Sequence, residues 1–135
     1  MILDTSFLID LMEGDPEAGA LATRIENRTQ RIPAQVVYEL HIGVGYTDTP
    51  REEVEKLQAV LDSRPIVETT AEIARLAGRM DGRLRKEGQR PGASDVIIGA
   101  TARHFDEPVV TGNVADFEAM PGVDVVAVEE FERGY

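Results

Sequence analysis

The chain begins Met1-Ile2-Leu3-Asp4-Thr5-Ser6-Phe7-Leu8, a stretch in which a short apolar run passes directly into a helical pattern. Ile2-Leu3 is predicted to be a short buried strand, and Asp4 or Thr5 is suited to cap the helix that follows. A buried strand joined to a helix without a linker is a building unit of α/β folds. This opening therefore indicates the fold class.

The same alternation of strand and helix continues along the chain. Residues 31–33 are predicted to be extended, and further strands are predicted at 66–67, 108–110 and 125–128. Helices are predicted after Asp15-Pro16 and over 35–46, 51–61, 70–87, 94–105 and 114–120. Helices between short buried strands imply a parallel sheet covered on both faces, which is a three-layer α/β/α arrangement. With no internal repeat or linker in the sequence, residues 1–135 are expected to form a single domain.

Two features of this pattern lead to local predictions. Thr70 and Ser94 each precede a helical run and are expected to cap it through their hydroxyl groups. The helix over 35–46 is apolar almost all round, so it is expected to be buried, and its partly aromatic run through Tyr38, Val44 and Tyr46 is a candidate interface.

The composition limits the class of protein. The chain has no cysteine, which excludes disulfides and thiolate zinc sites and fits a cytoplasmic location. Its apolar runs are far shorter than the roughly 20 residues of a membrane span, and no basic leader precedes the first strand. The net charge of −11 disfavours a polyanionic partner overall, although an acidic surface also suits a cell of high internal salt.

Four carboxylates occupy positions that call for an explanation. Asp4 and Asp116 follow predicted strands, where open parallel sheets place their sites. Glu39 and Asp95 interrupt apolar helices, where a carboxylate is costly unless it is hydrogen-bonded, paired or bound to a metal. Simpler roles stay open for three of them: a helix cap for Asp4, a favourable helix-dipole position for Asp95, and a turn residue in Asp116. Glu39 has no such simple role.

If the fold gathers these acids, their mutual repulsion requires a compensating cation. Oxygen ligands favour Mg²⁺ or Mn²⁺ over Zn²⁺, which usually recruits His or Cys. His41 and His104 form no metal pair by their spacing, and no serine lies in a Gly-x-Ser-x-Gly elbow. The residues therefore favour an oxygen-rich metal site over a nucleophilic triad.

Four motifs carry a resemblance to a known family. They are Leu3-Asp4-Thr5-Ser6-Phe7-Leu8-Ile9-Asp10, Ile32-Pro33-Ala34-Gln35-Val36-Val37-Tyr38-Glu39-Leu40, Asp95-Val96-Ile97-Ile98-Gly99-Ala100, and Val110-Thr111-Gly112-Asn113-Val114-Ala115-Asp116-Phe117. In their order, spacing and total length, they resemble the PIN-domain nucleases, and most closely the VapC-type toxins of prokaryotic toxin–antitoxin pairs. The resemblance implies a PIN-like α/β/α domain with a short, mainly parallel central sheet.

The resemblance also implies an active site and an activity. One or two Mg²⁺ or Mn²⁺ ions would be bound by Asp4, Glu39, Asp95 and Asp116. The activity would be that of an endoribonuclease, which hydrolyses RNA phosphodiester bonds and leaves 5′-phosphate and 3′-hydroxyl ends. The polar residues implied to support the metal shell are Ser6, Thr111 and Asn113. Gly112 stands where relatives often carry Arg or another polar residue, and it is assigned no role.

Partners follow from the same resemblance. They are the RNA substrate, a cognate VapB-type antitoxin and a second copy of the chain in a homodimer. A basic stretch, residues 73–92, has six basic and two acidic residues and so a charge of +4, which leaves −15 for the remainder. The residues expected to line one helix face and its extension, and so to guide the RNA backbone, are Arg75, Arg79, Arg83, Lys86 and Arg90. A solvated helix face stabilised by local ion pairs is the competing interpretation.

Two other functions are weighed against the nuclease. A non-catalytic PIN-like module that binds a protein or RNA would be expected to lose one or more of the acids, and all four are present. A phosphatase with an aspartyl nucleophile usually needs a second Asp two residues after the first, and Ser6 occupies that position.

Overall fold

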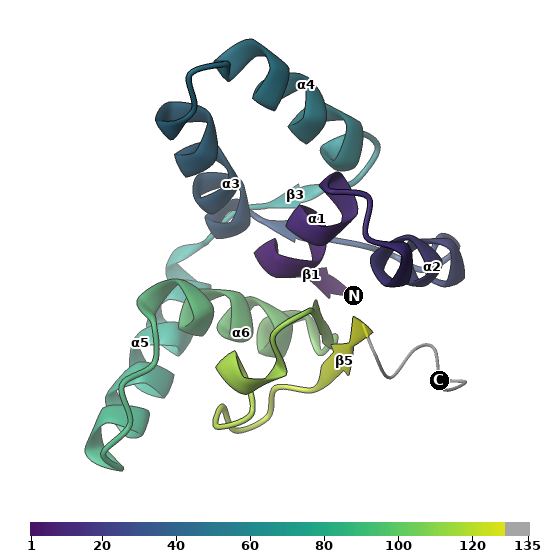
Figure 1. The fold of residues 1–135 in the computed structure, drawn as a ribbon. Helices are drawn as coiled ribbons and strands as arrows, with labels where there is room; N and C mark the ends of the chain where they lie inside the picture. The colour runs from purple at the N-terminus through teal and green to yellow at the C-terminus, as the bar shows by residue number, and fades with distance from the viewer. Residues whose placement is uncertain (129–135) are drawn as a thin grey trace.

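The computed structural model describes residues 1–128, in which short strands alternate with helices (Figure 1). The strands are β1 (Ile2–Leu3), β2 (Ile32–Pro33), β3 (Ile66–Val67), β4 (Val109–Thr111) and β5 (Val125–Ala127). The helices are α1 (Thr5–Met12), α2 (Pro16–Arg24), α3 (Ala34–Tyr46), α4 (Pro50–Leu61), α5 (Ala71–Lys86), α6 (Ala93–Phe105) and the short 3-10 helix η1 (Val114–Asp116). The predicted α/β class is confirmed. The prediction of one domain over 1–135 includes residues 129–135, which lie outside the described part.

All strand pairs in the described chain are parallel. β1 pairs with β4 and β4 with β5, while β2 pairs with β3. A bridge between Ile2 and Arg31 links the two groups, and the Arg31 N–H donates to the Met1 carbonyl at 2.8 Å. The strands therefore follow the order β3-β2-β1-β4-β5. Their carboxyl ends share one edge, and Asp4 and Thr111 lie there.

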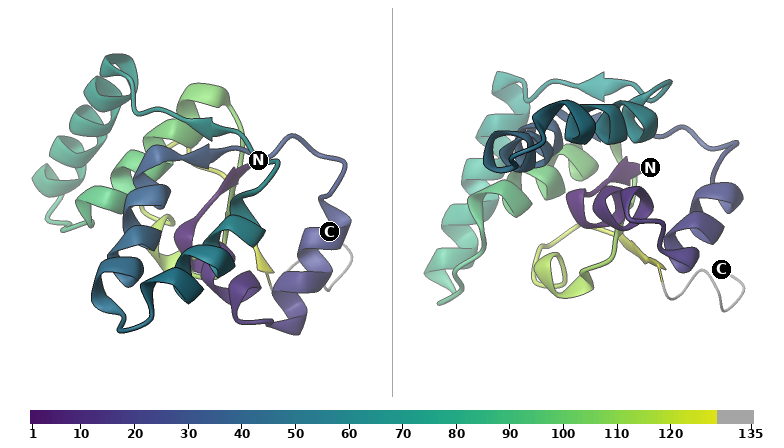
Figure 2. Two further views of the ribbon diagram at one scale, coloured as in Figure 1. Left: turned by 90° about the horizontal axis from the view of Figure 1, so that it is seen from above. Right: turned by 45° about the horizontal axis from the view of Figure 1, so that its top comes forward.

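Helices cover both faces of this sheet. In Figure 1, α4 and most of α3 lie above β1 and β3, and α5 and α6 lie below these two strands, while Figure 2 shows α2 and α5 at opposite ends of the molecule. Phe7 and Leu8 of α1 and Ile98 of α6 are fully buried in one core with the strand residues. The three-layer arrangement is confirmed. None of the described helices combines the length and apolar character needed to cross a membrane.

Gly99 of α6 allows the segment after η1 to approach closely. A Cβ atom at this position would lie only 2.6 Å from the sulfur of Met120. Met120 is itself 3% exposed, so this contact belongs to the core. The absence of a side chain at Gly99 thereby brings the segment that carries Asp116 against the helix that carries Asp95.

Helix starts agree with the sequence in one case and not in another. The Thr70 hydroxyl accepts the backbone N–H of Ile73 at 3.2 Å, so the predicted cap of α5 is confirmed. The prediction for Ser94 is wrong, because α6 begins one residue earlier, at Ala93, and its cap residue is Gly92. The Ser94 hydroxyl therefore does not cap α6 and can form hydrogen bonds with residues of other elements.

Two further predictions need correction. The helix expected over 114–120 is only the single turn of η1, followed by turns. The burial expected for α3 is wrong on one side, because Tyr38, Ile42 and Tyr46 are 62%, 54% and 91% exposed. Helix α3 packs on α1, α4 and α6 and leaves these residues, spaced four apart, on its outer face.

Candidate active site

Asp4 stands at the carboxyl end of β1 and is 4% exposed. It occupies the position before α1, but its side chain makes no capping hydrogen bond to that helix. Its Oδ2 instead accepts hydrogen bonds from Ser6 Oγ at 2.8 Å and Thr111 Oγ1 at 2.7 Å. Asp4 is therefore a buried carboxylate held by hydroxyl groups, and a side-chain cap does not explain it.

The two hydroxyls that hold Asp4 also join neighbouring strand ends. Ser6 Oγ and Thr111 Oγ1 lie 3.0 Å apart. Ser6 Oγ accepts the backbone N–H of Gly112 at 3.0 Å, and Thr111 Oγ1 accepts that of Asn113 at 2.9 Å. Ser6 and Thr111 thus contact the carboxylate of Asp4 directly, whereas Asn113 takes part through its backbone alone in these hydrogen bonds.

Gly112 has a reason to be small. A Cβ atom there would lie 2.9 Å from Asp10 Oδ2 and 3.7 Å from Ser6 Oγ. Any larger residue requires the Asp10 side chain to move. The carboxylate of Asp10 takes up the space beside this position, and burial together with the nearby charges of Asp15 and Glu13 raises its pKa.

Glu39, on α3, is held in the same way by hydroxyl groups from two other elements. Its Oε1 accepts Thr5 Oγ1 at 3.0 Å and Ser94 Oγ at 2.6 Å. Ser94 Oγ in turn accepts a hydrogen bond from Gln35 Nε2 at 3.0 Å. These contacts tie α3 to the starts of α1 and α6 and fix one oxygen of the carboxylate.

Sequence reasoning missed Thr5, Ser94 and Gln35 as parts of this arrangement. Each hydroxyl residue adjoins one of the four acids in the sequence, Thr5 after Asp4 and Ser94 before Asp95. That adjacency was the available signal. It suggested helix caps, because the chain alone does not show that Glu39 lies across from both hydroxyls.

The raised pKa values of Asp95 and Asp116 show that these two acids lie near other carboxylates. The pKa of Asp95 is raised to about 6, first by burial and then by the negative charges of the other three acids. Partial desolvation and then the charge of Asp4 raise the pKa of Asp116, although most of this side chain is exposed. Asp95 is therefore close enough to the other three carboxylates, which come from segments far apart in the sequence, to be repelled by each of them.

The arrangement fits a hard cation in its chemistry. Among residues 1–128, no three acidic or histidine side chains converge closely enough to hold one ion together. The donor set is nonetheless entirely oxygen, two of its carboxylates are fixed by hydroxyls, and the repulsion that raises the pKa of Asp95 is the kind that a cation removes. His41 and His104 bond elsewhere, to the Val37 carbonyl and Glu72.

The predicted basic stripe separates into two parts. Arg75, Arg79, Arg83 and Lys86 are exposed on α5, opposite its buried residues, and Arg83 lies 3.8 Å from Glu87 in a local ion pair. Arg90 follows the helix and lines a hollow together with Asp95 and Asp116. Of the five basic residues, Arg90 is the one that the structure brings to the carboxylates.

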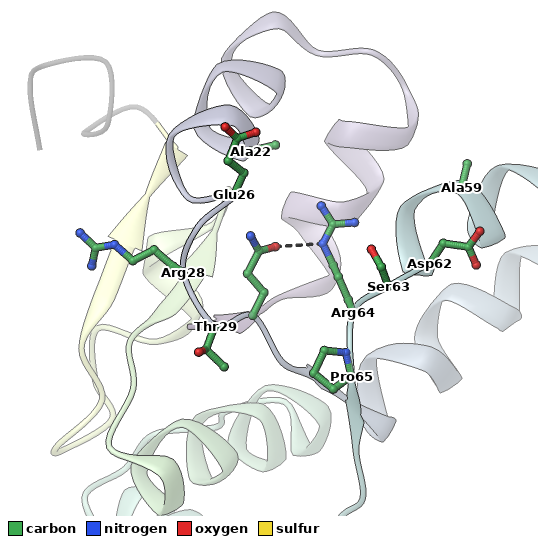
Figure 3. Close-up of a pocket in the computed structure, with 10 residues that line it drawn as sticks. Ala22, Glu26, Arg28, Thr29, Ala59, Asp62, Ser63, Arg64 and Pro65 are labelled. Carbon is green, nitrogen blue, oxygen red and sulfur yellow. Dashed lines mark hydrogen bonds between the residues drawn. The ribbon is translucent and has the colours of Figure 1, made fainter.

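A separate hollow of about 520 Å³ lies beside the end of α4 (Figure 3). Its lining contains none of the four carboxylates. Arg28 and Arg64 are offset there by Glu26 and Asp62, and the Arg64 Nε already donates to Gln30 Oε1 at 2.9 Å. Its charges thus favour no single class of ligand.

The chain is similar in sequence to a known protein family and to two of its members. The family model for the PIN domain matches residues 1–123. The chain is 28% identical over 120 residues to "Ribonuclease VapC19" of Mycobacterium tuberculosis, which covers 89% of this chain and 94% of that relative. It is 24% identical over 124 residues to "Ribonuclease VapC2" of Rickettsia felis, with 90% and 92% covered.

A solved structure is similar in fold. It is the crystal structure of VapBC2 from Rickettsia felis bound to a DNA fragment from its promoter. The TM-score is 0.87 at 20% identity, over 93% of this chain and 96% of that one. At this identity, the likeness concerns the path of the chain.

Proposed function

Because the chain belongs to the PIN-domain family, we propose that it is a metal-dependent endoribonuclease, the toxin of a VapBC-type toxin–antitoxin pair. Its substrate is RNA, and it acts in the cytoplasm as a single domain over residues 1–135. Its metal ligands and catalytic residues are Asp4, Glu39, Asp95 and Asp116. The names of the relatives, both ribonucleases, support the activity.

One observation carries this proposal. Asp95 is repelled by three carboxylates from other segments of the chain, and one of these, Asp4, is almost completely buried at the carboxyl edge of a parallel sheet. A folded protein keeps such repulsion where a bound cation offsets it in the working state. A non-catalytic PIN-like module has no need of it, and a phosphatase with an aspartyl nucleophile has Ser6 in place of its second Asp.

The roles of the four acids differ with the contacts that each side chain makes. Ser6 and Thr111 orient Asp4, while Thr5 and Ser94 orient Glu39, so that these two carboxylates present a set direction to one or two ions. A bound Mg²⁺ or Mn²⁺ supplies an acidified water and offsets charge on the phosphate under attack. Asp95 and Asp116 would complete the set of metal ligands or orient a water molecule.

We propose two protein partners, a VapB-type antitoxin and a second copy of this chain. The structure from Rickettsia felis that shares this fold is of VapBC2, which supports the first partner. Tyr38, Ile42 and Tyr46 form an exposed apolar stripe on α3, which supports an interface with one of the two.

The test is cleavage of RNA by the purified chain and its Asp4→Asn and Asp95→Asn variants, in Mg²⁺, in Mn²⁺ and in EDTA. We expect the wild type to cleave in either metal and both variants and the EDTA sample to be inactive. Asp48→Asn is the matched control, since Asp48 is an exposed acid on the turn between α3 and α4. Equal cleavage by the wild type and both site variants would contradict the proposal.

A further inference from the structure

A hollow of about 230 Å³ opens beside two of the proposed catalytic acids. It lies between the connection from α5 to α6 and the segment that follows η1, which Figure 1 shows on the same side of the molecule as α6. Asp95 and Asp116 form part of its wall. A molecule that enters this hollow therefore lies next to the proposed metal site.

The lining of the hollow is of three chemical kinds. Pro91, Ala115 and Ala119 supply the apolar surface that a ligand can reach, and the buried side chains of Leu84 and Met120 lie beneath it. Gln89 supplies an amide, and Arg90 a guanidinium. Both Gln89 and Arg90 are exposed at the rim.

Arg90 is left available by the described part of the chain, residues 1–128. It makes no ion pair or side-chain hydrogen bond with a described residue, whereas Arg83 pairs with Glu87 and Arg85 with Asp81. The lining holds two carboxylates, Asp95 and Asp116, and one cation, Arg90. The net charge of the hollow is therefore negative when both acids are ionised. A free anion is thus disfavoured, but a ligand whose anionic group reaches only the rim is not.

Size narrows the class of ligand further. The volume is below the range of about 300–1,000 Å³ that is usual for drug-sized ligands. An unstacked base offers a flat apolar face and a hydrogen-bonding edge, and single-stranded RNA presents bases in this way. The phosphate of the same nucleotide is an ordinary partner for arginine.

We propose that this hollow binds one unstacked nucleotide of the RNA substrate, next to the bond that is cleaved. The base packs on Pro91 and Ala119, Gln89 meets the edge of the base, and Arg90 binds the adjoining phosphate. This inference rests on the proposed ribonuclease function. It separates Arg90, which positions substrate, from the arginines of α5, which contribute only to the general potential.

The first test compares two arginine substitutions. A fluorescein-labelled single-stranded RNA is bound to wild type, Arg90→Gln and Arg79→Gln in Ca²⁺, and its cleavage is followed in Mg²⁺. Arg79 is the matched control, an exposed arginine of α5 that does not line the hollow. We expect Arg90→Gln to raise Kd and KM about tenfold with kcat unchanged, and Arg79→Gln to change them less than about twofold. Equal effects of the two substitutions would overturn the proposal.

The second test fills the hollow. Ala119→Leu adds a side chain at the lining, and Ala74→Leu adds the same side chain to the exposed face of α5. Oligonucleotides with a single abasic residue are scanned along the sequence. We expect one abasic position to weaken binding to the wild type and to Ala74→Leu, and to have no further effect on Ala119→Leu, which already binds weakly. Full affinity of Ala119→Leu for intact RNA would rule out the base site.

The results also distinguish this inference from the nuclease proposal. If RNA binds in a manner that depends on Arg90 but is not cleaved, the nucleotide site stands and the nuclease proposal fails. If RNA is cleaved and Arg90→Gln and Ala119→Leu keep the wild-type KM, the nuclease stands and the nucleotide site is wrong. Thermal unfolding of each variant shows that its fold is intact.

Discussion

The two halves of the site hold their carboxylates in different ways. Asp4 and Glu39 each accept two hydroxyl hydrogen bonds, whereas the side chains of Asp95 and Asp116 accept none from residues 1–128. Asp4 is buried, and Asp116 is exposed. Hydroxyl groups of the fold therefore fix the carboxylates of Asp4 and Glu39, while those of Asp95 and Asp116 are left without such hydrogen bonds from residues 1–128.

The largest expected effect separates Asp4 from Asp116. Asp4→Asn is expected to lower the rate of RNA cleavage more than about a hundredfold, because it removes charge from the one acid that is both buried and doubly held. Asp116→Asn is expected to lose less, since its exposed carboxylate has fewer fixed contacts. Single-turnover cleavage rates of the two variants check the order. A greater loss of rate for Asp116→Asn would contradict the larger role given to Asp4.

The next effect concerns the hydroxyls that orient Asp4. Thr111→Val keeps the shape of a fully buried side chain but removes its hydrogen bonds to Asp4 and to the Asn113 N–H. We expect a loss of about 10-fold to 100-fold in Mg²⁺ affinity, measured by calorimetry, and a parallel loss in activity.

Thr101→Val is the control for this substitution. Thr101 is 1% exposed, and among residues 1–128 its hydroxyl forms a hydrogen bond only with the Ile97 carbonyl within α6. It is expected to alter stability without a selective loss of Mg²⁺ affinity. Similar Mg²⁺ affinity in Thr111→Val and Thr101→Val would mean that the contact to Asp4 is purely structural.

A smaller effect distinguishes the two roles considered for Ser94. Ser94→Ala removes the 2.6 Å hydrogen bond to Glu39 and is expected to weaken Mg²⁺ binding about tenfold. Thr70→Ala removes a true helix cap and is expected to lower the free energy of unfolding by about 1 kcal/mol with activity unchanged. Chemical denaturation and calorimetry on both variants check this contrast. The opposite pattern, with Ser94→Ala affecting stability alone, would restore Ser94 as a cap.

The smallest effect is a pH dependence of stability in EDTA. The pKa of Asp95 is raised from 3.8 to about 6, so the folded chain binds this proton more tightly than the unfolded chain does. The resulting stabilisation is present at low pH and is lost as the pH rises through about 6. Asp95→Asn is therefore expected to have a higher Tm than wild type at pH 7, with a smaller difference at pH 5. A difference in Tm that does not change with pH would contradict the repulsion among the acids.

Much of the fold was predictable because local patterns are strong here. The apolar pair Ile2-Leu3 and the cap Thr70 are short-range signals, and the structure agrees with both. The exposure of Tyr46 was not predictable, because an apolar residue on a helix indicates a partner surface without saying whether that surface lies inside the chain. Ser94 shows a related limit, since the same hydroxyl suits a cap or a distant carboxylate.

The candidate site follows the same division. The order of residues was enough to identify the acids that interrupt apolar segments and those that adjoin the ends of strands, because burial of a charge is costly wherever it occurs in the chain. It took the folded chain to reveal that the hydroxyls of Thr5 and Ser94 meet at Glu39, and that Arg90 lies beside Asp95 and Asp116 while Arg79 does not. These contacts join residues far apart in sequence, and their geometry depends on how α3, α6 and η1 pack around the sheet.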